Sequence, residues 1–146
     1  MSSRPRITDR AWAVFLCRVV LGLIFLMAGV FKCFQMTPLG HARELFVEPY
    51  ANTFLPVWSL WATGVLVPIV ELVAGGLVVV GFKTRPALLS LGGVLVLVTF
   101  GHLFKEPFYE FHTHVIPRLA LLTVVLLLPR EEDTLSLDSL LARRSP

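Results

Sequence analysis

Four long apolar runs dominate this sequence and decide what the chain can fold into. Short polar stretches separate the runs and hold nearly all of the charged residues. Hydrophobic residues make up 55% of the 146 residues and charged residues 16%, against about 25% charged residues in soluble domains. A chain of this length has too small an interior to bury so much apolar surface. The sequence therefore predicts an integral membrane protein and excludes an ordinary soluble enzyme.

Each apolar run predicts one transmembrane helix, because about 20 apolar residues cross a hydrocarbon layer of roughly 30 Å. The predicted helices cover residues 11–34, 56–82, 86–104 and 112–129, with a loop at 35–55 and a tail at 130–146. The first run contains Arg18 and lacks an A-x-A site, so we expect a retained helix and not a cleaved signal peptide. The predicted fold class is all-α, a single transmembrane domain built as an integral membrane four-helix bundle. The fourth run is short and has to be tilted or buried to span the membrane.

The positions of Lys and Arg predict the orientation, since cytoplasmic loops are enriched in these residues. One side of the predicted bundle carries Arg4, Arg6, Arg10, Lys83, Arg85, Arg130, Arg143 and Arg144. The other side carries Arg43 and Lys105. Both termini are therefore expected in the cytoplasm of a bacterium, with the chain in the cytoplasmic (inner) membrane. The tail has leucines at helical spacing, which fits either a short helix on the inner surface or a solvated tail.

Polar and small residues inside the first two runs recur at helical spacing and form two stripes. The first stripe is Arg18, Gly22, Phe25, Gly29 and Lys32, and the second is Trp61, Gly64, Pro68, Glu71 and Gly75. Small residues let helix backbones approach closely, so the two stripes are expected to meet. Their depths in the membrane predict an intramembrane ion pair between Arg18 and Glu71. Such a pair fits a structural staple and, alternatively, a proton- or ligand-linked site.

A second group of polar residues gathers among aromatic residues at the predicted outer ends of the helices. Its members are Lys32, His102, His112, His114 and Arg118, and His41 of the first loop could join them. One interpretation is an interfacial aromatic belt with snorkelling cations. Another is a candidate pocket for a quinone or a lipid headgroup, in which a His or Lys donates to a carbonyl. A metal site at the two neighbouring histidines is the weakest interpretation, since no Cys, Asp or Glu pattern accompanies them, and no metal is expected.

Three stretches resemble the DoxX family of small bacterial membrane proteins. They are RVVLGLIFLMAGVFK (18–32), PIVELVAGGLVVVGFKTR (68–85) and LSLDSLL (135–141). The resemblance implies a four-helix bundle and a link to thiosulfate:quinone oxidoreduction or to membrane redox complexes. It draws attention to Arg18, Lys32 and Glu71. The loop 35–55 and the His-rich segment 102–114 depart from the pattern of that family.

Three functions fit these observations. The favoured one is an accessory or scaffolding subunit of a larger, quinone-linked membrane redox complex, not catalytic on its own. Its partners are the lipid bilayer and other membrane subunits; with no basic stripe, nucleic acid is not among them. No covalently bound cofactor is expected, although a quinone or a lipid could bind. The second function is a small quinone-reactive oxidoreductase using the outer His/Lys/Arg cluster. The third is a small-solute carrier, for which four short helices leave little room.

Overall fold

The computed structural model describes residues 7–106 and 111–143, and every regular element in these ranges is helical. The elements are α1 (Asp9–Val30), the π-helical turn η1 (Phe31–Gln35), α2 (Pro38–Ala42), the π-helical turn η2 (Arg43–Val47), α3 (Val57–Val80), α4 (Thr84–Lys105), α5 (Phe111–Leu127), the 3-10 turn η3 (Arg130–Glu132) and α6 (Leu137–Ala142). The all-α class predicted from the sequence is therefore confirmed.

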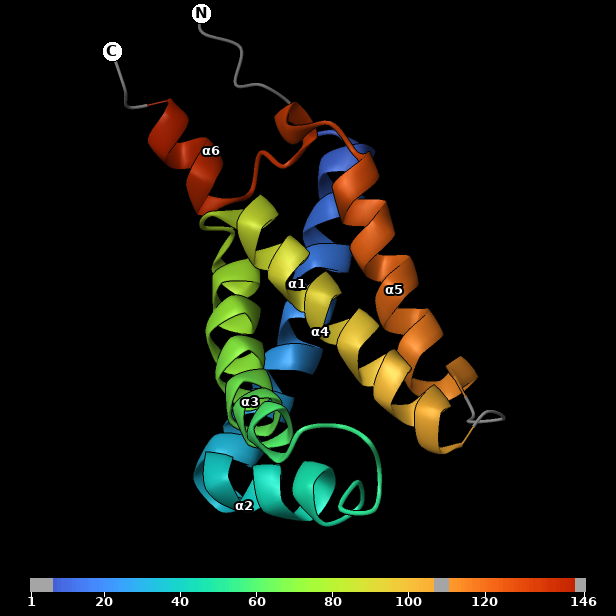
Figure 1. Cartoon of the computed structure of the whole chain (residues 1–146). Coiled ribbons are helices and arrows are strands. Elements are labelled where there is room, and N and C mark those ends of the chain that lie inside the picture. Colours follow the sequence, from blue (N-terminus) through green and yellow to red (C-terminus); the bar gives the residue numbers. More distant parts are fainter. Residues whose placement is uncertain (1–6, 107–110, 144–146) are drawn as a thin grey trace, which may run out of the picture.

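The long helices α1, α3, α4 and α5 pack together, with α2 at one end and α6 at the other (Figure 1). We call the end that holds α2 the loop end and the end that holds α6 the terminal end. Buried apolar side chains from all four long helices form one core. The core includes Val14, Leu21, Phe25, Ala74, Val78, Leu88, Leu91, Leu95, Leu122 and Val125.

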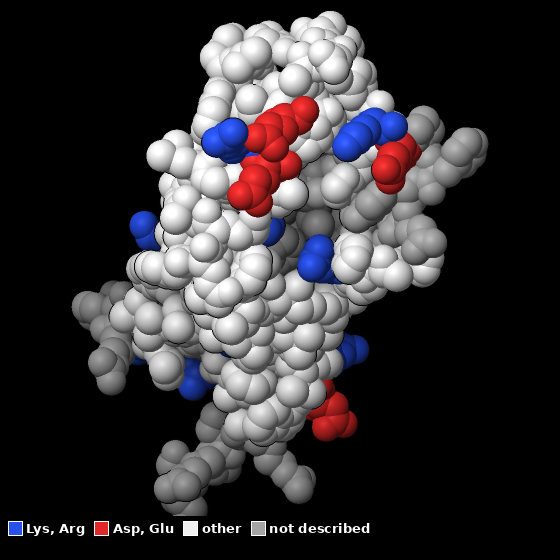
Figure 2. Space-filling view, turned by 90° about the horizontal axis from the view of Figure 1, so that it is seen from below, with Lys and Arg blue, Asp and Glu red and all other residues white. Residues whose placement is uncertain are grey.

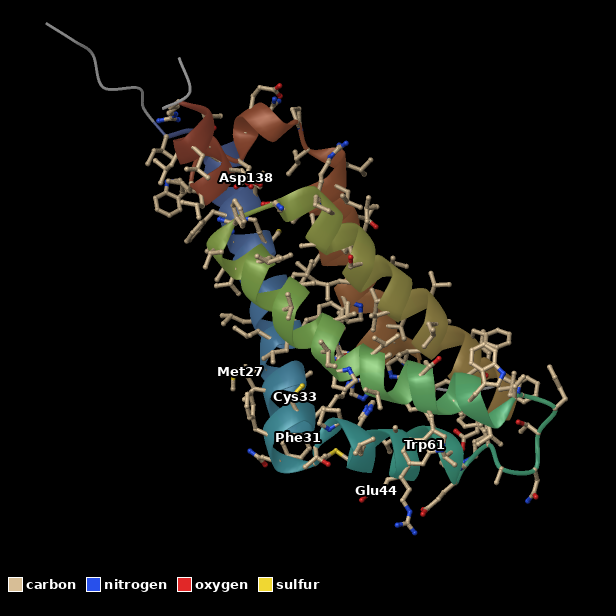
Figure 3. The ribbon with its side chains drawn as sticks, turned by 60° about the vertical axis from the view of Figure 1, so that its left-hand side comes forward. Met27, Phe31, Cys33, Glu44, Trp61 and Asp138 are labelled. Atoms are coloured by element: carbon tan, nitrogen blue, oxygen red, sulfur yellow. The ribbon has the colours of Figure 1, made fainter. Side chains whose placement is uncertain are left out.

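Three helical segments of the described chain are long and apolar enough to cross a membrane: Asp9–Gln35, α3 and α4. A shorter apolar helix, His112–Leu127, occupies the predicted fourth run. Large apolar side chains remain exposed along these helices, and Figure 3 shows Met27 and Phe31 pointing outward from the chain segment of α1 and η1. Multiple membrane crossings follow from these segments, while the fourth span and the cytoplasmic termini stay predictions.

The backbones of α1 and α3 approach each other closely, and glycines make this possible. A Cβ on Gly22 would lie 3.0 Å from the carbonyl oxygen of Gly75. A Cβ on Gly75 would lie 2.5 Å from the backbone nitrogen of Leu26. Further along the interface, Gly29 packs directly on the backbone of Leu72. The two stripes of small residues therefore meet, as their spacing predicts.

A Gly29→Ala variant tests this close approach. Its new Cβ would lie 2.6 Å from the Cα of Leu72, and a helix backbone cannot move aside as a side chain can. We expect the free energy of unfolding to fall by about 1–3 kcal/mol, the usual cost of overpacking. Gly93→Ala in α4 is the matched control, because a Cβ there meets nothing within 4 Å. Thermal unfolding in detergent measures both, and equal midpoints for the two variants would contradict the packing.

The predicted loop 35–55 contains short helical elements, α2 and η2, and is not irregular throughout. The hydroxyl of Thr37 begins α2 by accepting the backbone N–H of Gly40 at 3.1 Å. At the other end of the segment, the Tyr50 hydroxyl donates to the carbonyl oxygen of Gly101 in α4 at 2.7 Å. Apolar periodicity does not reveal such elements, because five residues are too few to establish a helical period.

Candidate functional site

Arg18 lies on α1 with its side chain 1% exposed, and it binds two other parts of the chain. Its Nη1 donates to the carbonyl oxygens of Val78 at 2.6 Å and Val79 at 2.8 Å. Its Nη2 donates to the carbonyl oxygen of Leu135 at 3.0 Å, and its Nε lies 3.3 Å from Oδ1 of Asp133. Carbonyls in the last turn of a helix have no partner within the helix, so this guanidinium caps α3 with a positive charge.

The segment after η3 docks onto the turn between α3 and α4, and we call residues 133–138 the tail latch. The two carboxylate oxygens of Asp138 accept the backbone N–H groups of Lys83 at 2.8 Å and Thr84 at 2.9 Å. The backbone N–H of Asp138 donates in turn to the carbonyl oxygen of Gly81 at 2.8 Å. Figure 3 shows Asp138 beside this turn. The latch thus caps the start of α4, where Lys83 offers no side-chain cap of its own.

Gly81 allows the tail latch to sit against the end of α3. Its φ of +71° is the left-handed conformation that ends many helices, and glycine adopts it without strain. A Cβ there would lie 2.6 Å from the Cβ of Ser136 and 2.8 Å from Nη1 of Arg18. The tail is therefore folded, and α6 begins within the latch and carries exposed Leu140 and Leu141. The sequence predicted either a short helix or a solvated tail for this region, and the structure contains the short helix α6.

A second ion pair, partly buried, lies nearer the loop end, where Nζ of Lys32 is 2.6 Å from Oε2 of Glu71. The predicted pairing of Arg18 with Glu71 is wrong. Depths counted from the ends of the apolar runs misplaced the two helices along each other, because α1 begins well beyond the carboxyl end of α3. Arg18 therefore faces the last turn of α3, and the packing of Gly29 on Leu72 brings Lys32 level with Glu71.

His41 supplies a hydrogen bond that α3 cannot make for itself. Pro68 has no backbone N–H, so the carbonyl oxygen of Gly64, four residues earlier, lacks its helical donor. The Nδ1 of His41 lies 2.7 Å from that oxygen, and it must carry a proton to donate. The imidazole is buried, and burial lowers the pKa of His41 below its ordinary value, with Lys32 acting in the same direction. His41 is thus part of the packing against α3.

The lowered pKa of His41 predicts a pH-dependent stability. The unfolded chain takes up a proton near the ordinary histidine pKa of about 6.5, whereas the folded chain resists it. Stability should therefore fall as the pH drops below that value, by at most about 1.4 kcal/mol per pH unit. In His41→Asn the amide keeps a donor for Gly64 but cannot titrate, so thermal midpoints measured from pH 7.5 to 5 should depend less on pH. An equal slope for the wild-type chain and for His41→Asn would contradict the assignment.

Two cations of the predicted outer pocket face the interior of the protein. Lys32 is engaged by Glu71, as described above. The guanidinium carbon of Arg118 in α5 lies 5.8 Å from the centroid of the Phe25 ring in α1, within the range of a cation–π contact. Lys32 therefore joins η1 to α3, and Arg118 joins α5 to α1. Sequence spacing did not identify the partners of these two cations.

The histidines of the predicted pocket lie on α4 and α5. His112 and His114 are exposed, and His102 interacts electrostatically with His114. Within the described residues, no group of three or more His, Cys, Asp or Glu side chains is placed to hold a metal ion. On the loop end, acidic and basic side chains lie next to each other, as Figure 2 shows, and Arg43 pairs with Glu48 at 2.8 Å. The quinone or headgroup pocket stays a prediction.

A comparison with protein-family models gives one family for this chain. The model described as methylamine utilisation protein MauE matches residues 10–106, which run from α1 through α4. The match includes Arg18, the Lys32–Glu71 pair and His41, while α5 and the tail latch lie beyond it. Searches of curated proteins and of solved structures gave no significant match.

The family match corrects the resemblance to DoxX, which is a different family. Apolar helices with glycines and a few charges at helical spacing recur in unrelated membrane proteins, because lipid imposes the same composition on all of them. The matched region covers more than half of the sequence. Together with the three membrane-length apolar segments, it identifies a multi-pass bacterial membrane protein. The chain belongs to the MauE family of methylamine utilisation proteins.

Proposed function

We propose that this chain is an accessory membrane subunit of a redox system that serves methylamine utilisation. The observation that carries the proposal is the family match over residues 10–106, whose description names that process. Accessory here means that the chain holds or positions a redox partner in the membrane and does not itself perform the chemistry.

The use of the buried polar groups supports this role. Arg18 bonds to α3 and to the tail latch, the Lys32–Glu71 pair joins η1 to α3, and His41 repairs the hydrogen bonding of α3. The polar atoms of each of these groups bind one element of the chain to another. Such an arrangement favours a rigid scaffold over a site that must bind and release a substrate.

The outer surface of the helices is available to lipid or to a membrane partner. Large apolar side chains such as Leu66, Val73 and Val96 are exposed on α3 and α4. We extend the proposal to a bundle of four spans, with α5 as a tilted fourth span and both termini in the cytoplasm. This orientation follows the positions of Lys and Arg and places the loop end outside.

Growth on methylamine tests the link to methylamine utilisation. A strain that lacks this chain should fail to grow with methylamine as the nitrogen source and should grow normally on ammonium. Undiminished growth on methylamine would exclude the proposal. A matching measurement is the amount of the methylamine-oxidising enzyme in the same strain, which should fall if the chain holds or matures a partner.

Gentle solubilisation separates an accessory role from an independent one. The tagged chain, purified from native membranes under mild conditions, should elute with a redox protein in a fixed ratio, identified by mass spectrometry. The matched control is Gly29→Ala, in which α1 and α3 cannot pack correctly and the ratio should drop. Elution of the folded wild-type chain alone, without a redox protein, would contradict the accessory role.

A further inference from the structure

A groove of about 690 Å³ opens at the terminal end, between the start of α4, the end of α5 and the tail that follows. Three cationic residues, Lys83, Arg85 and Arg143, are among those that line it. Nη2 of Arg85 reaches the carbonyl oxygen of Leu126 at 3.4 Å, so its guanidinium extends from α4 toward α5. We call this space the terminal groove.

Two of the three acidic residues of the terminal groove are already engaged by other groups. Asp138 accepts the backbone N–H groups at the start of α4, and Asp133 lies against Arg18. Glu131, in the 3-10 turn η3, is the third acid of the lining. Arg18, which balances Asp133, brings the cations at the groove to four against three carboxylates, so positive charge exceeds negative charge by one. An anion is therefore the ligand that its charge favours.

A buried hydroxyl adds a directional group to this charge. Thr84 is only 8% exposed, and its Oγ1 has no hydrogen-bond partner among the described residues. Thr134 also lines the groove, and its Oγ1 is likewise buried without a hydrogen-bond partner among the described residues. Buried polar atoms in proteins nearly always have a partner, so these hydroxyls suit a ligand with acceptor oxygens. A phosphate group supplies such oxygens and a negative charge.

An apolar groove of about 340 Å³ meets the terminal groove at the start of α4. Both are lined by Lys83 and Pro86. The rest of the apolar groove is formed by side chains of α3 and α4 inside the membrane-length segments. These are Ile69, Val70, Val73, Ala74, Leu77, Ala87 and Ser90. A charged space at the helix ends thus continues into an apolar one along the helices.

We propose that the terminal end binds one anionic phospholipid. Lys83 and Arg85 hold its phosphate, the Thr84 hydroxyl donates to a phosphate oxygen, and one acyl chain lies in the apolar groove between α3 and α4. Basic pockets between transmembrane helices recognise anionic headgroups in this way. Free phosphate has the same headgroup chemistry but makes no use of the apolar groove, which is why the lipid is favoured. The site is independent of the proposed role in methylamine utilisation.

Native mass spectrometry of the purified full-length chain, titrated with phosphatidylglycerol or phosphatidylcholine, tests the site. We expect one tightly held phosphatidylglycerol and little phosphatidylcholine. Removing both cations in Lys83→Gln/Arg85→Gln should weaken phosphatidylglycerol binding by about tenfold or more. Lys105→Gln, which removes a cation at the loop end, should leave binding unchanged. Both replaced side chains are exposed in the folded chain, so thermal unfolding should show intact folds.

Ser90→Trp tests the acyl-chain part by filling the apolar groove from the exposed side of α4. It should weaken phosphatidylglycerol binding while both cations remain in place. Inorganic phosphate should compete poorly with the lipid in the wild-type chain. The proposal is overturned if Lys83→Gln/Arg85→Gln binds the lipid as Lys105→Gln does. It is equally overturned if inorganic phosphate displaces the lipid at equal concentration and Ser90→Trp has no effect, since the site would then hold free phosphate.

Discussion

An Arg18→Leu variant should unfold in detergent with a free energy about 3–5 kcal/mol lower than that of the wild-type chain. The replacement removes the donor for the carbonyls of Val78 and Leu135 and leaves Asp133 without its counter-charge. Circular dichroism during thermal unfolding measures the loss. The control is Arg10→Leu, because the Arg10 side chain is 76% exposed and its pair with an acidic residue of η3 should contribute about 0–1 kcal/mol.

The double variant Arg18→Leu/Asp133→Asn separates the charge from the helix cap. Burial raises the pKa of Asp133, and Arg18 opposes that rise. Neutral asparagine needs no counter-charge, so the double variant should regain part of the lost stability. It should not regain all of it, since the carbonyls at the end of α3 remain without a donor. Equal stability of Arg18→Leu and Arg10→Leu would contradict the role assigned to Arg18.

A Lys32→Leu variant should lose stability on a similar scale, about 3–5 kcal/mol, because it leaves Glu71 as a buried charge without a partner. The Glu71 side chain is 7% exposed and lies within a membrane-length helix, so water does not compensate it. The double variant Lys32→Leu/Glu71→Leu should recover most of the loss, since two apolar side chains of similar volume can replace a buried pair. Thermal unfolding in one detergent compares the wild-type chain, Lys32→Leu and the double variant.

The same double variant distinguishes a structural staple from a functional pair. If the pair only holds η1 to α3, the variant with both leucines should be stable and should support growth on methylamine. A stable double variant that fails to support growth would show that the charges themselves are needed. A double variant as unstable as Lys32→Leu would contradict the proposed compensation.

Apolar runs predicted the long helices closely because burial in lipid demands continuous apolar composition. The predicted run 56–82 contains α3 (Val57–Val80), and 86–104 lies within α4 (Thr84–Lys105). The sequence also predicted which faces of α1 and α3 contact each other, since glycines at helical spacing mark a face of close contact. The register of that contact could not be predicted, because a shift of one helical turn preserves the spacing of each stripe.

Helical periodicity in the sequence could not predict the partners of the buried polar groups. Asp133 and Asp138 belong to a polar tail, and nothing in their spacing relates them to α1 or to the start of α4. His41 had a usable signal, because Pro68 leaves the carbonyl of Gly64 without a donor and so demands one from elsewhere. That signal states the need for a donor but does not name the residue that supplies it.

The tail latch also has a meaning for how the protein is made. Its residues are synthesised after every apolar helix that they hold together, since chain growth runs from the N-terminus. Until the tail has been synthesised, Arg18 therefore lacks Asp133 and the carbonyl oxygen of Leu135 as partners. The start of α4 likewise lacks its cap from Asp138. The contacts of the tail latch are consequently among the last that the chain can form during synthesis.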